Sequence, residues 1–394
     1  MKTFLKLIAR EFRLFFSNSV AVVILIGAPV AYGLLFGFVY QQGIVTDLPV
    51  AVVDQNRTET SRILIDAMND NQHIEIVAIV PDISLLNNDL KSGKIVGFVN
   101  IPHKFEQDIF MQRYPQLHVE LNAVNIVNTN FALRGLRESL ETINAGLQIE
   151  ALQKQGVPAS IASQQFEAFS ISTFSNFNPS LNYLTFLFPG LLATILQQVL
   201  LLALALSFSK DYEDGTFPEL LKHTTSPMMV LLTKSFPYLL MGGLIWLMIL
   251  HMLLAAFGVS NAGSWAMIYS LSIMFILSVT AIGILISAVI PSQLKSTEIL
   301  MVIATPAFII SGFTWPLSQM PEWVIWIASV IPLTHFLEAI RNVMLAGATW
   351  HHVSNELWAM FWLTFVPVTL SYIVVSYKMK AIKPEVSKIS GSTV

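Results

Sequence analysis

A short segment, SKDYEDGTFPELLK at residues 209–222, concentrates acidic side chains between two long apolar stretches. Its carboxylates outnumber its two lysines and are Asp211, Glu213, Asp214 and Glu219. Carboxylates in such a loop can pair with a basic surface of another protein, where they set the register and the choice of partner. Gly215 permits a tight turn, and Asp214 or Thr216 can cap a short helix over Thr216 to His223 that presents Glu219. A solvated connecting loop is the alternative, and the residues alone favour neither.

Motifs that would carry catalysis are missing from the sequence. There is no cysteine, which excludes disulfides, thiol catalysis and cysteine-type zinc sites. No G-x-x-x-x-G-K-[ST], H-E-x-x-H or G-x-S-x-G motif occurs, so the chain has no P-loop for ATP and no protease or esterase signature. The histidines and carboxylates show no metal-ligand spacing. We therefore expect no catalytic residue and no metal site, and the net charge of −3 indicates no nucleic-acid partner.

The chain as a whole is too apolar for water. Of its 394 residues, 54% are hydrophobic and 12% are charged, whereas a soluble domain carries about 25% charged residues. Six segments are long and apolar enough to cross a hydrocarbon core that needs about 20 residues. These predicted spans cover residues 20–40, 181–208, 230–257, 265–290, 299–313 and 357–377. The predicted fold class is an α-helical polytopic membrane protein with six transmembrane helices.

A re-entrant element is expected after the fifth span. Gly312 and Pro316 break the helix before a second apolar run, Trp323–Ile331, which is too short to cross the membrane. Irregular backbone at this depth is tolerated where protein buries it, so we predict an outer re-entrant segment over residues 312–347. Glu338 and Arg341 lie three residues apart on one helical face, which predicts an ion pair.

The distribution of Lys and Arg predicts the orientation. With the N-terminus inside, the inner segments carry twelve of these residues and the short outer segments carry only Arg341. The positive-inside rule then places both termini and the 209–222 segment in the cytoplasm of a bacterial inner-membrane protein. Residues 1–19 form an amphipathic interfacial helix that meets membrane lipids, and residues 378–394 form a cytoplasmic tail. The first apolar run exceeds the 7–15 residues usual in a cleaved signal peptide, so we expect an uncleaved anchor.

Residues 41–180 have ordinary soluble character between the first two spans. Four strand-like stretches, 48–54, 73–80, 95–102 and 117–123, alternate with helix-periodic runs at 58–69, 83–91 and 104–112, and a longer run covers 128–154. This rhythm predicts an inserted extracytoplasmic α/β domain.

Charged groups are nearly absent from the predicted spans. We expect Gln197 and Gln198 to hydrogen-bond a neighbouring helix and His251 to be a hydrogen-bonded packing residue. A place on a substrate pathway is the alternative for these three. An ion-coupled carrier would be expected to keep carboxylates in mid-membrane, and none is predicted there, so the energy for transport is expected from elsewhere.

Three stretches resemble the permease subunit of ABC-2 type exporters, in the subgroup with a large domain between the first two spans. The first is residues 9–40, similar to an interfacial helix followed by a proline-containing span. The second, 210–240, contains an E-x-G-T core followed by Leu-Leu and Ser-Pro, through Glu213, Gly215, Thr216, Leu220, Leu221, Ser226, Pro227 and Lys234. The third, 311–347, matches an outer re-entrant signature through Ser311, Gly312, Pro316, Met320, Pro321, Trp323, Pro332, Thr334, Arg341 and Gly347. Tyr212 departs from the family, which commonly has a basic residue at that position.

The resemblance implies a function and a set of partners. A separate ABC ATPase subunit binds ATP and Mg, so this chain needs no cofactor, and residues 209–229 form the cytoplasmic loop that couples to it. A second permease protomer, identical or different, completes the transporter; a periplasmic adaptor is a further candidate. The outer turn around Gly312 would close a pathway for a hydrophobic or amphipathic substrate. A membrane-anchored receptor or assembly factor with a ligand-binding periplasmic domain is the alternative from another class.

Overall fold

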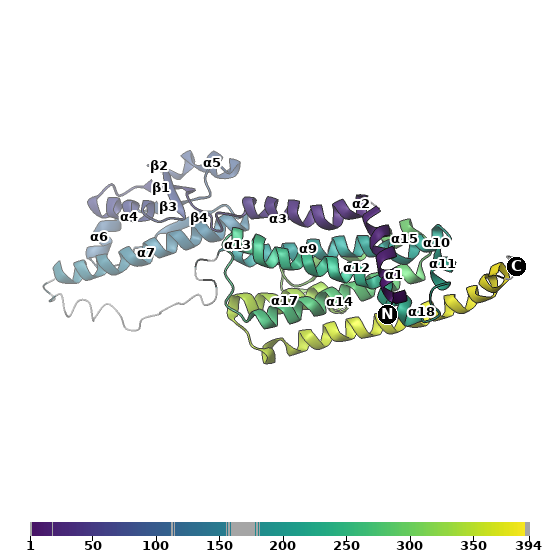
Figure 1. Cartoon of the computed structure of the whole chain (residues 1–394). Helices are drawn as coiled ribbons and strands as arrows, with labels where there is room; N and C mark the ends of the chain where they lie inside the picture. Colours follow the sequence, from purple (N-terminus) through teal and green to yellow (C-terminus); the bar gives the residue numbers. More distant parts are fainter. Residues whose placement is uncertain are drawn as a thin grey trace. The chain divides into compact units, whose positions relative to one another are not determined.

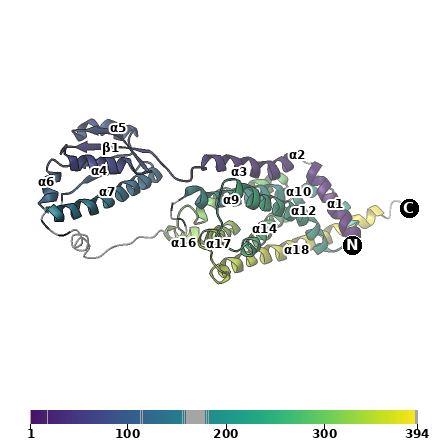
Figure 2. The ribbon, with the colours of Figure 1, turned by 60° about the vertical axis from the view of Figure 1, so that its left-hand side comes forward.

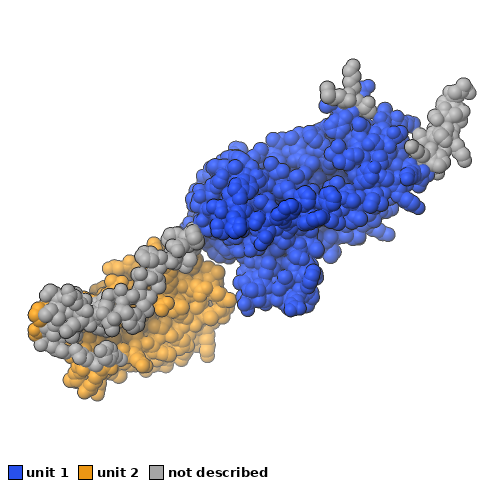
Figure 3. All heavy atoms as spheres, turned by 90° about the horizontal axis from the view of Figure 1, so that it is seen from below, with its two compact units in different colours: residues 1–43, 175–394 blue, residues 44–174 orange. Residues whose placement is uncertain are grey.

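The computed structural model describes residues 2–17, 19–111, 113, 115–154, 156, 158, 178, 180 and 182–390. The chain forms two compact units (Figure 3). One comprises residues 1–43 with 175–394, and the other comprises residues 44–174. Each is described by itself below.

The second unit is an α/β domain built on a four-stranded sheet in the order β2-β1-β3-β4. The strands are β1 (Leu48–Asp54), β2 (Ile74–Val80), β3 (Gly97–Ile101) and β4 (His118–Leu121). β1 pairs in parallel with β2 and β3, and β4 pairs antiparallel to β3. The helices are α4 (Glu59–Asn69), α5 (Asn87–Ser92), α6 (Phe105–Phe110) and α7 (Ile126–Lys154), with a 3₁₀ turn at Ile83–Leu85.

Both faces of β1 are buried, which explains its continuous apolar run. Val50 and Val52 pack on one face with Leu64 of α4 and Leu136 of α7. Ala51 and Val53 pack on the other face, with residues around α5. The strands and helices expected from the sequence are therefore present, with ends displaced by at most two residues except at α5, which begins at Asn87 rather than at residue 83.

The first unit is a bundle of long apolar helices. They are α9 (Tyr183–Ala205), α10 (Ser207–Glu213), α11 (Phe217–Leu221), α12 (Pro227–Met248), α14 (Trp265–Val289), α15 (Gln293–Ile310), α16 (Glu322–Ser329), α17 (Pro332–Ala346) and α18 (Ser354–Ser390). A π-helical turn, Ile249–Leu253, and the short α13 (Leu254–Ala256) extend α12. Central α14 packs against α9, α12, α17 and α18 (Figure 1).

Five helical segments of the described residues are long and apolar enough to cross a membrane. They are Tyr183–Glu213, Pro227–Ala256, Trp265–Val289, Gln293–Ile310 and Trp350–Ala381. These correspond to the second to sixth predicted spans, so the polytopic α-helical class is confirmed. The predicted fifth span was misplaced, because its helix begins at Gln293 and ends at Ile310 rather than covering 299–313.

The first predicted span is not one regular helix. It consists of α2 (Ser19–Val22), a π-helical segment (Val23–Gly27) and α3 (Ala28–Val39). Pro29 lies in the first turn of α3, where its missing N–H leaves few hydrogen bonds unmade. Its apolar part, Val23–Val39, is shorter than the other spans. The expected length of about 20 residues is reached only by adding α2.

Helices α16 and α17 form a sharply bent pair, with 86° between their axes. α16 ends at Ser329, and Pro332 starts α17 at its first helical position. α17 buries nine of its side chains, whereas α16 buries only Ala328. The two helices lie at the same end of the bundle (Figure 2). A broken span and a re-entrant loop would both give such a bent pair, so the re-entrant segment stays a prediction.

Helix α1 (Lys2–Ser17) has an amphipathic sequence and packs against α12. Leu7, Ile8 and Phe15 are buried, as a helical spacing of three to four residues allows. Glu11 lies on the same face and is also buried, with 7% of its surface exposed. A carboxylate on this packed face needs a partner.

Candidate functional site

The acidic segment forms two short helices joined by a tight turn. α10 ends at Glu213, Gly215 takes the left-handed conformation with φ of 66°, and α11 begins at Phe217. The predicted turn at Gly215 is therefore present, while the predicted helix is shorter than Thr216 to His223. Thr216 stands at the N-cap position but does not cap α11 with its side chain. Its hydroxyl instead donates a hydrogen bond to Oδ1 of Asp211, at 2.6 Å.

Asp211 does not lie on the surface as expected. It is 3% exposed, and its Oδ2 lies 2.6 Å from the ammonium nitrogen of Lys234. A side chain so deeply buried is not available to a partner protein. The segment was expected to present its carboxylates outward, and for Asp211 this expectation is wrong because the lysine that neutralises it comes from another helix.

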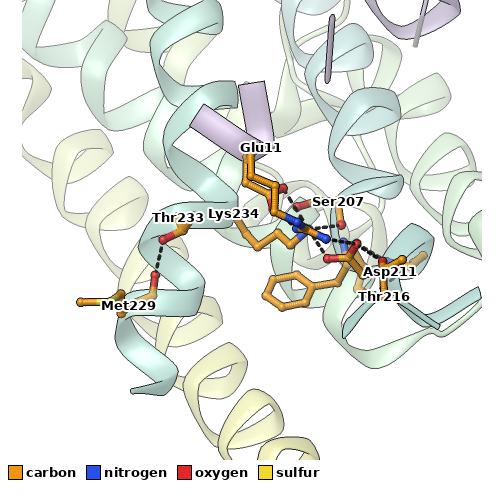
Figure 4. A network of polar contacts seen from close by, with 11 residues as sticks. Glu11, Ser207, Asp211, Thr216, Met229, Thr233 and Lys234 are labelled. Atoms are coloured by element: carbon orange, nitrogen blue, oxygen red, sulfur yellow. Dashed lines mark hydrogen bonds and ion pairs between the residues drawn. The ribbon is translucent and has the colours of Figure 1, made fainter. Parts of the chain in front are cut away.

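Lys234 occupies the second turn of α12 and is 1% exposed. Its ammonium group donates to Oε2 of Glu11 at 2.9 Å and to the carbonyl of Ser207 at 3.0 Å, in addition to the contact with Asp211. The ammonium group therefore has two hydrogen bonds and a close ion pair around it. Figure 4 shows the side chain of Lys234 directed between Glu11 and Asp211.

Arg10 completes what we call the buried charge cluster: Arg10, Glu11, Asp211 and Lys234. Its Nη1 lies 2.6 Å from Oε1 of Glu11 and its Nη2 lies 3.3 Å from Oδ1 of Asp211. Burial disfavours the charged guanidinium, but Asp211 and Glu11 outweigh that effect and raise the pKa of Arg10. Two cations and two anions thus neutralise one another.

The buried charge cluster joins three helices, α1, α10 and α12, of which α1 is distant from the other two in the sequence. Removing charged groups from water costs free energy, and the attraction between the paired charges offsets that cost only while their geometry is kept. Loss of Lys234 would leave Glu11 and Asp211 with only the partly exposed Arg10 between them. The cluster therefore makes any relative displacement of these three segments energetically expensive.

The opposite side of α10 is attached to the junction between α14 and α15. Oγ of Ser209 donates to the carbonyl of Ile290 at 2.7 Å and contacts Oγ of Ser296 at 2.7 Å. Glu213 accepts hydrogen bonds from the backbone and side-chain nitrogens of Gln293, at 3.2 and 2.5 Å. α10 is therefore held on both sides, by the buried charge cluster and by these contacts.

Tyr212 connects the same segment to α18. The ammonium nitrogen of Lys378 lies 3.9 Å from the centroid of the Tyr212 ring and donates to the carbonyl of Ala288 at 2.7 Å. The ring also packs against Phe217 of α11, with centroids 5.0 Å apart. The family that the sequence resembles commonly has a basic residue at the position of Tyr212. In this chain Lys378 of α18 brings a positive charge to the same place.

The remaining carboxylates of the segment are exposed. Asp214 and Glu219 face solvent, whereas Leu220 of α11 is fully buried. Glu213 is exposed, but its carboxylate accepts a hydrogen bond from Gln293. The segment thus has a buried, fixed side and an acidic outer side, and only the outer side can meet another molecule.

The turn predicted to lie on the outer side connects α15 to α16. Gly312 has φ of 81°, and a Cβ atom there would come within 2.6 Å of Leu317. Pro316 and Pro321 precede short helical turns, Trp323 is exposed and Met320 half-buried, while Pro332 and Thr334 are buried in the first turn of α17. In the described part of the chain, the expected ion pair between Glu338 and Arg341 does not form; Arg341 lies over the Phe313 ring, 5.5 Å from its centroid.

The three polar residues within the bundle differ in environment. Gln197 is 1% exposed, and neither atom of its amide group has a hydrogen-bond partner among the described residues. The expected bond to a neighbouring helix is therefore wrong for Gln197, which lines an otherwise apolar cavity of about 320 Å³. Gln198 is half-buried. Nε2 of His251 lies 2.7 Å from the hydroxyl of Tyr269, as expected for a hydrogen-bonded packing residue.

Two members of the buried charge cluster escaped the sequence interpretation. Glu11 was overlooked, and Lys234 was named as a position of the family resemblance and not as a buried charge, although it lies within the apolar run of α12. A lone lysine inside a predicted span, and a lone glutamate on an apolar helix face, were the available signals. Among the described residues, no three His, Asp or Glu side chains are grouped as a metal site.

The sequence was compared with protein-family models and with known proteins. The model of the ABC-2 family transporter protein matches residues 20–373. The chain is 27% identical over 196 residues to the probable multidrug ABC transporter permease YbhR of Escherichia coli, covering 50% of this chain and 53% of that relative. It therefore spans about half the length of YbhR. It is also 26% identical over 321 residues to the probable multidrug ABC transporter permease YbhS of E. coli, covering 80% of this chain and 82% of YbhS.

Proposed function

This chain belongs to the ABC-2 transporter family, and we propose that it is the permease subunit of an exporter driven by a separate ATPase subunit. The family match and the permease relatives support this role. The substrate would move outward across the inner membrane, with residues 209–229 and both termini on the cytoplasmic side.

The observation that carries the coupling role is the attachment of α10 on both sides. A flexible connecting loop has no need for the buried charge cluster or for the contacts of Ser209 and Glu213 with the α14–α15 junction. Because α10 is fixed to α1, α12 and α15, a force applied to the exposed carboxylates Asp214 and Glu219 would reach these helices. Movement of an ATPase subunit would thereby be transmitted to the bundle.

We place the substrate in contact with the apolar helices around Gln197. The cavity there has an almost wholly apolar lining, which includes Leu201, Val279 and Ile303. Such a lining favours a hydrophobic or amphipathic molecule. A second permease protomer completes the pathway, and the outer turn around Gly312 closes its outer end.

The experiment uses the lack of native cysteine, which makes an introduced thiol unique. The chain would be co-expressed with the candidate ATPase subunit, carrying either Glu219→Cys in the acidic segment or Trp323→Cys at the opposite end of the bundle. We expect a short bifunctional reagent to cross-link the ATPase to the first variant only. In intact spheroplasts, a membrane-impermeant maleimide should label the second variant only.

Two results would contradict the proposal. Labelling of Glu219→Cys from outside intact spheroplasts would place the segment on the wrong side of the membrane. Failure of any ATP-hydrolysing subunit to purify with the chain would favour a membrane-anchored receptor or assembly factor.

A further inference from the structure

A second cavity, of about 400 Å³, lies beside the outer turn. Its wall consists of the turn itself, Phe186 of α9, and two charged side chains of α17, Glu338 and Arg341. Phe186 stacks on Phe313 with ring centroids 5.1 Å apart, which gives the cavity an aromatic side. It therefore offers a cation, an anion and apolar surface in one space.

The two charges of this cavity are unmatched. Glu338 and Arg341 are one helical turn apart, a spacing at which opposite charges commonly pair. Within the described part of the chain they form no ion pair with each other or with any other residue, and Arg341 instead lies over the face of the Phe313 ring. The guanidinium keeps its donors for an anion, and the Glu338 carboxylate keeps its acceptors for a cation.

The surroundings of the cavity indicate a membrane interface. Trp315, Trp323 and Trp326 belong to the same outer segment and are 58%, 66% and 76% exposed. Tryptophan is enriched where lipid headgroups meet the hydrocarbon core. A ligand entering this cavity from the bilayer would bring its headgroup to the charged side chains.

We infer that this cavity binds the phosphoethanolamine headgroup of a membrane phospholipid. The planar guanidinium of Arg341 is suited to two oxygens of the phosphate, and the carboxylate of Glu338 accepts hydrogen bonds from the ammonium group. Phe186, Phe313 and Leu317 contact the glycerol and the first acyl carbons. This assignment needs only a membrane location and does not depend on the direction of transport.

The chemistry separates this headgroup from the other common ones. A phosphatidylglycerol headgroup has the phosphate but no cation for Glu338. A phosphatidylcholine headgroup has a cation, but its trimethylammonium group has no N–H to donate. Phosphatidylethanolamine alone among these three satisfies both Arg341 and Glu338.

The test is lipid binding to the purified full-length chain, measured by native mass spectrometry after delipidation and titration with each of the three phospholipids. We expect the wild type to bind phosphatidylethanolamine at least about tenfold more tightly than phosphatidylcholine, as one charge-assisted hydrogen bond allows. Glu338→Gln should remove that preference while phosphatidylglycerol still binds. Arg341→Gln should weaken the binding of phosphatidylethanolamine and phosphatidylglycerol together.

The controls are charges outside the cavity: Glu322→Gln, on exposed α16, and Lys222→Gln, at the other end of the bundle. Both should bind as the wild type does. Soluble glycerophosphoethanolamine should not displace the lipid, because it lacks the acyl chains. The inference fails if Glu338→Gln keeps the wild-type preference, if the control variants lose it equally, or if glycerophosphoethanolamine displaces the lipid, which would identify a soluble ligand.

Discussion

The ammonium nitrogen of Lys234 in α12 lies 2.6 Å from Oδ2 of Asp211 in α10, and both side chains are almost fully buried. Glu11 of α1 shares the same ammonium group at 2.9 Å. These charges join three helices that also share the apolar core of the bundle through Phe15, Phe208 and Tyr238. The rotation of α10 about its own axis is also fixed. Asp211 must face Lys234 while Ser209, on the other side of the helix, contacts the α14–α15 junction.

Lys234→Met should destabilise the protein strongly, because it leaves Glu11 and Asp211 buried with only Arg10 between them. Removing one partner of a buried ion pair typically costs about 3–5 kcal/mol. The expected result is a lower melting temperature in detergent, measured by intrinsic fluorescence, and loss of ATPase stimulation by the assembled complex.

A matched control for this substitution is Lys222→Met, an exposed lysine in the same acidic segment. Its melting temperature should change little, since surface substitutions usually stay within about 0.5 kcal/mol. Adding Asp211→Asn to Lys234→Met should restore part of the stability by removing the orphaned anion. Equal melting temperatures for Lys234→Met and the wild type would show that the cluster does not hold the three segments together.

The periodic elements of the fold follow from the sequence because each depends on local pattern. Short strand-like stretches between helix-periodic runs located the strands of the α/β domain, and length with hydropathy located five long apolar helices. The partners of individual polar residues did not follow, because they come from distant segments. Asp211 was taken for a surface acid, since nothing near it in the sequence reveals Lys234; Gln197 was taken for a bonded residue, although its neighbours in space are apolar.

Neutralising the exposed carboxylates should affect the partner rather than the fold. The double substitution Asp214→Asn with Glu219→Gln leaves the buried charge cluster intact, so the melting temperature should stay unchanged. Charges at the edge of an interface act mainly on the association rate and are screened by salt. We expect the affinity for the ATPase subunit to fall about tenfold at low ionic strength and much less in high salt.

That change would be measured by surface plasmon resonance with the permease in nanodiscs. The control is Glu322→Gln, which removes an exposed acid from the opposite end of the bundle. An unchanged affinity in the Asp214/Glu219 variant would exclude these acids from the contact with the ATPase.

Gly312→Val should disturb the outer turn. Its φ of 81° disfavours any side chain, and a Cβ would meet Leu317 Cγ at 2.6 Å, so a cost of about 1–3 kcal/mol is expected. Transport in vesicles should fall while the ATPase subunit still purifies with the chain. Gly243→Ala is the control, because its Cβ meets nothing within 4 Å in helix α12; it should be neutral or slightly stabilising. Normal export by Gly312→Val would contradict a gating role for this turn.

Gln197→Leu is expected to stabilise the protein in detergent while it alters transport. The amide of Gln197 is buried without a hydrogen-bond partner among the described residues, and such a group costs about 1–3 kcal/mol. Leucine would fill the same apolar cavity without that cost, so the melting temperature should rise, whereas Gln198→Leu, at a half-buried position, should change it little. Substrates that hydrogen-bond to the amide should be transported more slowly by Gln197→Leu, and purely apolar ones at an unchanged rate. A fall in melting temperature would instead mean that the amide of Gln197 has a hydrogen-bond partner in the protein. That result would contradict the proposal that this amide is free to contact substrate.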